Sequence, residues 1–373
     1  RVLGGYSNES AIFVVAWVAI WAVPFFIKGK LGQIPVSSGE FLYGIFMLYF
    51  GAIVLINWAS GAPLEVTLSH TASIIQLTAV FLVFRLAPIS SRGMQKVLLS
   101  TVVIMSLLVY VAAANDTLTL LLIGNDNSNV ATYQSLARMF LLTIVIVTAF
   151  TPSRIKRMLH YLNATAVIFM LGARSEVAGL LVFAATLEWM FMRRKGIALL
   201  FIVLLFASVL QLVNAFLPQL SNWLPENRVL LLLEYGGLDG SAQDRKELMQ
   251  FALNSIAADP IFGEYGSYYV LGSAGKYAHN ILSAWVDLGI LGFSLLVALL
   301  ARLLINYVIA QRKLNPATPA SAIAFHALGY GLLMQTLFFL MAAKNFTDLS
   351  VAAVVGITGA FRAHMKALDI RAT

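Results

Sequence analysis

Apolar stretches long enough to cross a lipid bilayer recur along the whole chain, and this pattern most limits the folds available to it. A membrane-spanning helix needs about 20 apolar residues, and inside the hydrocarbon only helices or closed barrels satisfy every backbone polar group. Charged residues make up 11% of the 373 residues and hydrophobic residues 60%, whereas a soluble domain carries about 25% charged residues. The sequence therefore predicts an all-α, polytopic transmembrane bundle that forms a single domain over residues 1–373.

The apolar runs define about eleven predicted spans. Residue 1 is Arg rather than Met, so a further N-terminal helix would bring the expected number to about twelve. The predicted spans are 11–27, 40–58, 69–87, 95–114, 131–150, 158–171, 176–192, 197–216, 281–301, 321–342 and 347–361.

Basic residues gather in every second connection between these spans. If the spans alternate in direction, all of the clusters lie on one side, which the positive-inside rule assigns to the cytoplasm. The opposite loops, such as 115–129, carry few basic residues. Because the net charge of +8 follows from this distribution, it does not indicate a nucleic-acid partner. The clusters are Lys28 and Lys30; Arg85, Arg92 and Lys96; Arg154, Lys156 and Arg157; Arg193, Arg194 and Lys195; Arg312 and Lys313; and Arg362 and Lys366.

Several kinds of chemistry are excluded by what the chain lacks. It has no cysteine, which rules out disulfides, thiolate metal sites and cysteine nucleophiles. Its five histidines form no pair at metal-binding helical spacing. We find no P-loop, Gly-x-Ser-x-Gly or His-Glu-x-x-His motif. We therefore expect neither a metal nor another cofactor.

One predicted span is too short to cross the bilayer. Residues 158–171 would form a helix of about 21 Å, against a hydrocarbon core of about 30 Å. The turn that follows, Gly172-Ala173-Arg174-Ser175-Glu176, is expected below the outer membrane surface. An ionisable residue at that depth indicates a functional site. The plainer alternative is that Arg174 and Glu176 pair with each other and fill the turn.

The single long connection, residues 218–280, is expected outside the cytoplasm as a partly helical loop. Ser241 with Asp244 resembles a helix cap, and apolar residues from Leu248 to Ile256 follow at helical spacing. Asp259-Pro260 should end that helix. Arg245 would lie in its first turn, where the helix dipole disfavours a cation, although a solvated charge beside Asp244 or Glu247 accounts for it equally well.

His279-Asn280 stands where this loop meets the next span, which continues as Asp287-Leu288-Gly289-Ile290-Leu291-Gly292. Together with Gly172-Ala173-Arg174-Ser175, Asp244-Arg245 and Asp259-Pro260-Ile261-Phe262-Gly263, these motifs resemble the O-antigen ligase and polymerase superfamily of bacterial inner-membrane glycosyltransferases. The motifs cover roughly residues 150–310, and the rest of the chain is similar only in hydropathy. The resemblance implies a GT-C-like fold and an active site that faces the periplasm.

The family pattern maps onto Arg174, Arg245 and His279 of this sequence. The implied donor is a glycan on undecaprenyl pyrophosphate, whose phosphates two guanidinium groups can bind. The implied acceptor is a sugar hydroxyl of lipid A-core, and an imidazole can take its proton at neutral pH. Asn280, Glu176 and Asp287 are candidates for supporting roles. Asp287 stands where the family often has Glu, which leaves its role open.

The resemblance implies an inverting transfer, and the arginines would replace a metal at the leaving group. The closest alternative is a polymerase of the same superfamily, which would use these residues on a lipid-linked acceptor. The presence of only one long external loop favours the ligase. A transporter is a weaker alternative, because transporters often show matching interrupted helices in two halves, and this sequence shows only one.

Overall fold

A computed structural model describes residues 36–114, 132–191, 240–271, 278–314 and 318–372, with the isolated positions 16 and 211. The described residues form helices, turns and short connections and contain no strand. Five of the described helices, α2, α3, α4, α13 and α14, are long and apolar enough to cross a bilayer. The protein is thus a polytopic helical membrane protein, as predicted.

Nine predicted spans coincide with helices of the structure, and the predicted spans 11–27 and 197–216 lie outside the described residues. The helices are α2 (Ser38–Ala59), α3 (Leu64–Leu86), α4 (Arg92–Ala114), α6 (Thr132–Ala149), α7 (Arg154–Met170), α8 (Arg174–Phe191), α12 (Gly240–Ala258), the short 3₁₀ helix η2 (Ser267–Leu271), α13 (Leu282–Lys313), α14 (Ala320–Ala342) and α15 (Leu349–Ala372).

The chain divides into two compact units. The first comprises residues 1–5 and 90–246 and contains α4, α6, α7 and α8. The second comprises residues 6–89 and 247–373 and contains α2, α3, α13, α14, α15 and most of α12. The single transmembrane domain expected over residues 1–373 stays a prediction.

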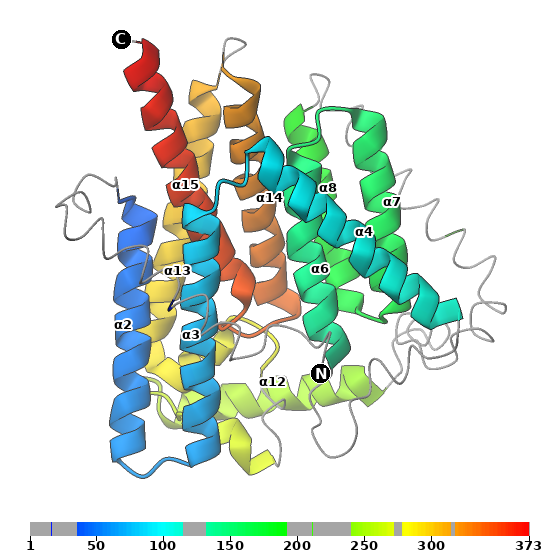
Figure 1. Ribbon diagram of the computed structural model, residues 1–373. Coiled ribbons are helices and arrows are strands. Elements are labelled where there is room, and N and C mark those ends of the chain that lie inside the picture. The colour runs from blue at the N-terminus through cyan, green and yellow to red at the C-terminus, as the bar shows by residue number, and fades with distance from the viewer. Residues whose placement is uncertain are drawn as a thin grey trace. The chain divides into compact units, whose positions relative to one another are not determined.

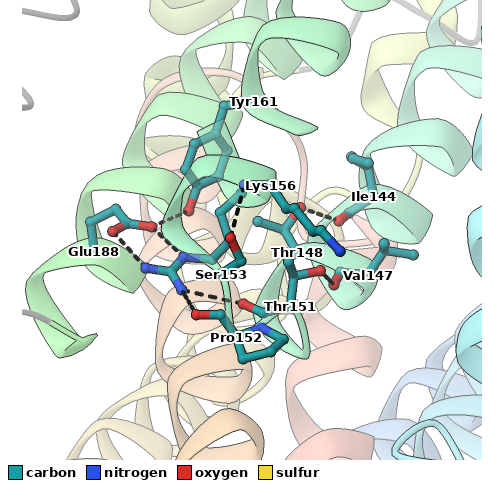
Figure 2. Close-up of polar contacts among 10 residues, drawn as sticks. Ile144, Val147, Thr148, Thr151, Pro152, Ser153, Lys156, Tyr161 and Glu188 are labelled. Carbon is teal, nitrogen blue, oxygen red and sulfur yellow. Dashed lines mark hydrogen bonds and ion pairs between the residues drawn. The ribbon is translucent and has the colours of Figure 1, made fainter. Parts of the chain in front are cut away.

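In the first unit, a buried ion pair joins α7 to α8 (Figure 2). Arg157 donates to Glu188 through Nε at 2.6 Å and through Nη2 at 2.9 Å, and both side chains are buried. Tyr161 Oη donates to the same carboxylate at 3.2 Å. The remaining Nη1 donates to the carbonyls of Thr151 and Pro152 just before α7. Arg157, which the sequence pattern assigned to a cytoplasmic loop, is therefore neutralised by Glu188 inside the helical core.

In the second unit, an ion pair fixes the ends of α2 and α3. Ser37 Oγ accepts from the backbone N–H of Glu40 at 3.1 Å, and Glu40 Oε2 accepts from the N–H of Ser37 at 2.7 Å, which completes a capping box at the start of α2. The other oxygen of Glu40 lies 2.6 Å from Arg85 Nε, in the last turn of α3. One carboxylate thus both caps α2 and neutralises Arg85.

The core of the second unit lies where α2, α3, α13 and α14 surround α15. α15 packs against α3 and α14, and α13 packs against α2 and α14. Phe46, Phe50 and Phe346 meet in this core with almost no exposed surface. α12 runs crosswise to α2 and α3 (Figure 1), near the end of the unit where α2 passes into α3.

Candidate functional site

The turn between α7 and α8 contains Arg174. α7 ends at Met170, and Gly172 adopts a φ of 68°, a left-handed conformation that favours glycine. α7 begins four residues earlier than the predicted span, at Arg154. Its length is about 25 Å, still below the hydrocarbon thickness of about 30 Å. The position of this turn below the membrane surface stays a prediction.

Arg174 is the first residue of α8, so a half-buried guanidinium stands at a helix N-terminus. Helix N-termini carry a positive partial charge and suit anionic ligands. Glu176 is fully buried in the same turn of the helix, and Ser175 Oγ donates to its carboxylate at 2.7 Å. Arg174 thus reinforces the charge of the helix end, whereas Glu176 points into the packed interior.

A second arginine of this unit was missed by the sequence reading. Arg138 lies in the first half of α6 with 6% of its surface exposed. The sequence offered no motif around it, and it counted only as part of the predicted span 131–150. An arginine buried within a membrane helix is a functional candidate by default.

Arg245 lies on α12 and is exposed. α12 begins at Gly240, earlier than the cap predicted at Ser241, so Arg245 falls in the second turn rather than the first. The dipole argument made from the sequence therefore applies to it only weakly, because the effect falls off beyond the first turn. Its exposed position nevertheless leaves the guanidinium accessible to a ligand.

One face of α12 packs against the start of α13 and fixes the position of His279-Asn280. Ala252 of α12 is buried in a small apolar cluster with Ala278 and Val286. Beside this cluster, Asn280 Nδ2 donates to Met249 Sδ at 3.1 Å. The part of α12 that belongs to the second unit and the turn that carries His279 are therefore held together by direct contacts.

The turn at His279 is well connected on its other side. Asn280 Oδ1 accepts from the N–H of Leu282 at 2.9 Å, and its carbonyl accepts from Ser283 Oγ at 2.7 Å. The N–H of Ile281 donates to the carbonyl of Leu340 near the end of α14 at 2.5 Å. His279 itself is half-buried. Asn280 therefore has a structural role, and His279 stands at a fixed position just before the start of α13.

Asp287 is buried and holds the loop between α12 and α13. It accepts from the N–H of Gly266 at 2.9 Å, and its second oxygen lies 3.9 Å from His70 Nε2. Tyr268 Oη lies 3.2 Å from the same nitrogen, and the ring of Tyr265 meets the His70 ring edge-on at 5.0 Å. We call these four side chains the His70 cluster: His70, Tyr265, Tyr268 and Asp287. Through this cluster, α3, the segment after α12 and α13 contact one another.

The hydroxyl of Tyr265 stays protonated over the physiological pH range. Burial raises the pKa of Tyr265 to about 12, and the Asp287 carboxylate acts in the same direction. Nearby, Tyr269 Oη donates to Glu65 Oε2 at 3.0 Å at the start of α3. The sequence missed the His70 cluster because its members come from segments far apart in the chain.

Two of the motifs quoted from the sequence contact each other. α13 is kinked at Gly289, whose φ of 66° and ψ of −176° only glycine adopts readily. A Cβ on Gly289 would lie 2.2 Å from the carbonyl oxygen of Ile261, and one on Gly263 would lie 2.5 Å from that of Val286. The N–H of Glu264 donates to Val286 at 2.6 Å. The segment 259–263 therefore docks into the kink of α13 through close backbone contacts.

The predicted site residues are divided between the two units. Arg174, Glu176 and Arg245 belong to the first, and His279, Asn280 and Asp287 belong to the second. Within the second unit, Asp287 lies in the His70 cluster and Asn280 contacts α12. That Arg174, Arg245 and His279 form one site stays a prediction.

Comparison with known proteins gives one informative match. Residues 159–297 match the family model described as O-antigen ligase, a range that runs from α7 to the first half of α13 and includes every predicted site residue. No curated protein matches the sequence. A solved chain from work on polymerization and crosslinking by a peptidoglycan synthase complex is 14% identical, covering 86% of this chain and 97% of that one, with a TM-score of 0.44. That degree of likeness carries no argument about this chain.

Proposed function

We propose that this chain, whose domain over residues 159–297 matches the family model described as O-antigen ligase, transfers a glycan from undecaprenyl pyrophosphate to a sugar hydroxyl of lipid A-core. The observation that carries the proposal is that the domain includes the half-buried Arg174 at a helix N-terminus and the fixed turn at His279. We place the reaction at the periplasmic face of the bacterial inner membrane. The proposed partners are the lipid-linked donor, the lipid A-core acceptor and the surrounding membrane lipids.

In the proposed reaction, the acceptor hydroxyl oxygen attacks the anomeric carbon of the donor sugar. The bond from that carbon to the pyrophosphate oxygen breaks, and undecaprenyl pyrophosphate leaves with the bonding electron pair. His279 takes the hydroxyl proton as general base. Attack on the face opposite the leaving group inverts the anomeric configuration.

Arg174 and Arg245 are proposed to bind the pyrophosphate. Guanidinium groups remain charged and bind phosphate oxygens through paired hydrogen bonds, so they stabilise the charge that develops on the leaving group. The N-terminus of α8 supplies additional positive potential at Arg174.

Because the arginines are proposed to stabilise the leaving group without a metal, we expect activity to survive chelation by EDTA. Loss of turnover that magnesium or manganese restores would contradict the role given to the arginines.

A polymerase of the same superfamily is the second candidate, because the family match is equally consistent with it. It would use the same residues but a lipid-linked glycan as acceptor. A deletion strain distinguishes the two. Accumulation of lipid-linked polymer with normal chain lengths indicates a ligase, whereas accumulation of single lipid-linked repeat units indicates a polymerase.

A further inference from the structure

The turn between α14 and α15, residues 343–348, lies directly beside the turn that carries His279. Ser283 connects the two: its Oγ donates to the carbonyl of Asn280 at 2.7 Å and accepts from the N–H of Phe346 at 3.0 Å. The hydrogen bond from Ile281 to Leu340 makes a second connection. These segments belong to one unit, so the α14–α15 turn forms part of the surroundings of His279.

Buried anchors fix this turn on the protein side. Phe346 is 1% exposed, and its ring centroid lies 5.2 Å from that of Phe50 in the core. Asp348 Oδ1 accepts from the N–H of Ser350 at 2.9 Å and from its hydroxyl, which caps the start of α15. The N–H of Lys344 donates to the carbonyl of Phe339 at 2.8 Å and closes α14. The turn therefore presents its remaining side chains at defined positions.

Those remaining side chains are polar and partly exposed: Lys344, Asn345 and Thr347. Thr347 Oγ1 donates to Asn345 Oδ1 at 3.1 Å, which orients the Asn345 amide. An ammonium group and an oriented amide on the same turn offer hydrogen-bond donors to phosphate oxygens and to sugar hydroxyls. This combination suits a ligand that is both anionic and rich in hydroxyls.

Lys344 is an exception to the way basic residues are distributed between the two sides of this protein. The orientation predicted from the basic clusters places the α14–α15 turn outside the cytoplasm, where loops of membrane proteins carry few Lys or Arg residues. A lysine at the end of a span also serves to reach the interface without a ligand. Its turn is hydrogen-bonded through Ser283 to the turn that carries His279, and this connection favours a ligand-binding role.

We propose that Lys344 and Asn345 bind a phosphate-bearing part of a glycan substrate next to His279. Lys344 contacts the phosphate, and the Asn345 amide contacts a neighbouring hydroxyl. The phosphate belongs either to the pyrophosphate of the lipid-linked donor or to a phosphate group on the acceptor glycan. This inference rests on the proposed function.

The test uses the full-length chain in lipid nanodiscs, with Lys344→Gln, Lys344→Arg and Asn345→Ala variants. Lys246→Gln is the control, because Lys246 is an exposed lysine on the side expected to be external. Substrates are an undecaprenyl-pyrophosphate-linked repeat unit and an acceptor glycan with or without its phosphates. Binding of undecaprenyl pyrophosphate is measured separately, so that one readout does not depend on turnover.

We expect Lys344→Gln to raise the KM of one substrate about tenfold, as the loss of one charged hydrogen bond would, with kcat little changed. Lys344→Arg should retain most of the affinity, Asn345→Ala should raise the same KM by a smaller factor, and Lys246→Gln should behave as the wild type. Weaker binding of undecaprenyl pyrophosphate identifies the donor as the source. A higher acceptor KM that disappears with the dephosphorylated acceptor identifies the acceptor.

Two results would overturn the inference. The first is a set of Lys344→Gln and Asn345→Ala proteins that match the wild type in both KM values and in undecaprenyl pyrophosphate binding. The second is an equal loss of kcat in Lys344→Gln and Lys344→Arg with a lower midpoint of thermal unfolding, which indicates a structural role. If the wild type binds the lipid but transfers no glycan to either acceptor, the proposed function fails, and the binding comparison still tests Lys344.

Discussion

At the scale of single residues, buried carboxylates of this protein form ion pairs or hydrogen bonds with groups on other segments of the chain. Glu188 binds Arg157 through both oxygens, Glu40 caps α2 while it binds Arg85, and Asp287 accepts from the backbone of Gly266. Each carboxylate therefore fixes the position of one segment against another. His279 and Arg245 differ from them, because the first is only half-buried and the second is exposed.

The Arg157–Glu188 pair gives a prediction about stability. Glu188→Gln should leave the buried Arg157 without its counter-charge and lower the free energy of unfolding by about 3–5 kcal/mol. The measurement is the midpoint of thermal unfolding in detergent. Lys156→Gln is the control, since Lys156 is exposed one position away and should change stability little. An unchanged midpoint for Glu188→Gln would show that the pair is not needed for folding.

The proposed roles of the site residues predict that their substitutions impair donor binding and turnover to different extents. Arg174→Ala and Arg245→Ala should weaken binding of undecaprenyl pyrophosphate as well as turnover. His279→Ala should keep donor binding and lose turnover by about 10²–10⁴-fold, as expected for a general base. The assays are equilibrium binding and transfer rate on folded, purified proteins. Near-normal turnover of His279→Ala rejects the general-base role, and lost donor binding would place His279 among the phosphate ligands.

At the scale of elements, the kink in α13 accounts for the glycines in two separate motifs. The segment 259–263 approaches the backbone of α13 so closely at Gly263 and Gly289 that neither position has space for a Cβ. Trp285 Nε1 adds a hydrogen bond to the carbonyl of Pro260 at 2.8 Å. The His70 cluster then holds the next residues of the loop. The docking of 259–263 and the His70 cluster both hold the segment that follows α12 against α13, within the second unit.

Gly289→Ala should therefore disrupt the docking of the loop. The substitution forces an L-residue into a conformation that costs about 1–3 kcal/mol, and it adds a clash with the carbonyl of Ile261. We expect a lower unfolding midpoint and faster proteolysis of the 259–271 segment. Gly51→Ala in α2 is the matched control, because a Cβ there meets nothing within 4 Å and alanine favours a helix. Equal behaviour of the two variants would contradict the docking.

At the scale of the whole molecule, the direction of the helices decides which residues face which side of the membrane. The basic clusters predict that the connection between α2 and α3 lies outside the cytoplasm and the connection between α3 and α4 lies inside. The turn at His279 and the α14–α15 turn then lie outside. The proposed active site and the inference about Lys344 both depend on this orientation.

Single cysteines test the orientation directly, because the chain contains no cysteine of its own. Ser60 and Ser91 are exposed serines in the connections at the two ends of α3. In intact spheroplasts, Ser60→Cys should react with an impermeant maleimide and Ser91→Cys should react only after the membrane is opened. The reverse labelling would invert the topology and remove His279 from the periplasmic side.

The sequence by itself determined the fold class and the spans within the described residues, because apolar stretches of about 20 residues fit membrane-spanning helices and are too long for the strands of a membrane barrel. It also identified the motifs that the family model covers, since each is a short local pattern. It placed the start of α7 four residues too late, because the buried Arg157 counted as a loop charge until its partner Glu188 was known.

Tertiary structure alone decided the contacts between distant segments. His70 and Tyr268 are 198 positions apart, and no local pattern indicates that they meet Asp287. The same holds for the docking of Gly263 at Gly289 and for the connection from Ser283 to Phe346. Such contacts arise from how helices pack after each has formed, so they depend on the shapes of several segments together. The contacts that Asn280 makes with Met249 and Asp287 makes with Gly266 became clear only from that packing, and their supporting roles at the site stay predictions.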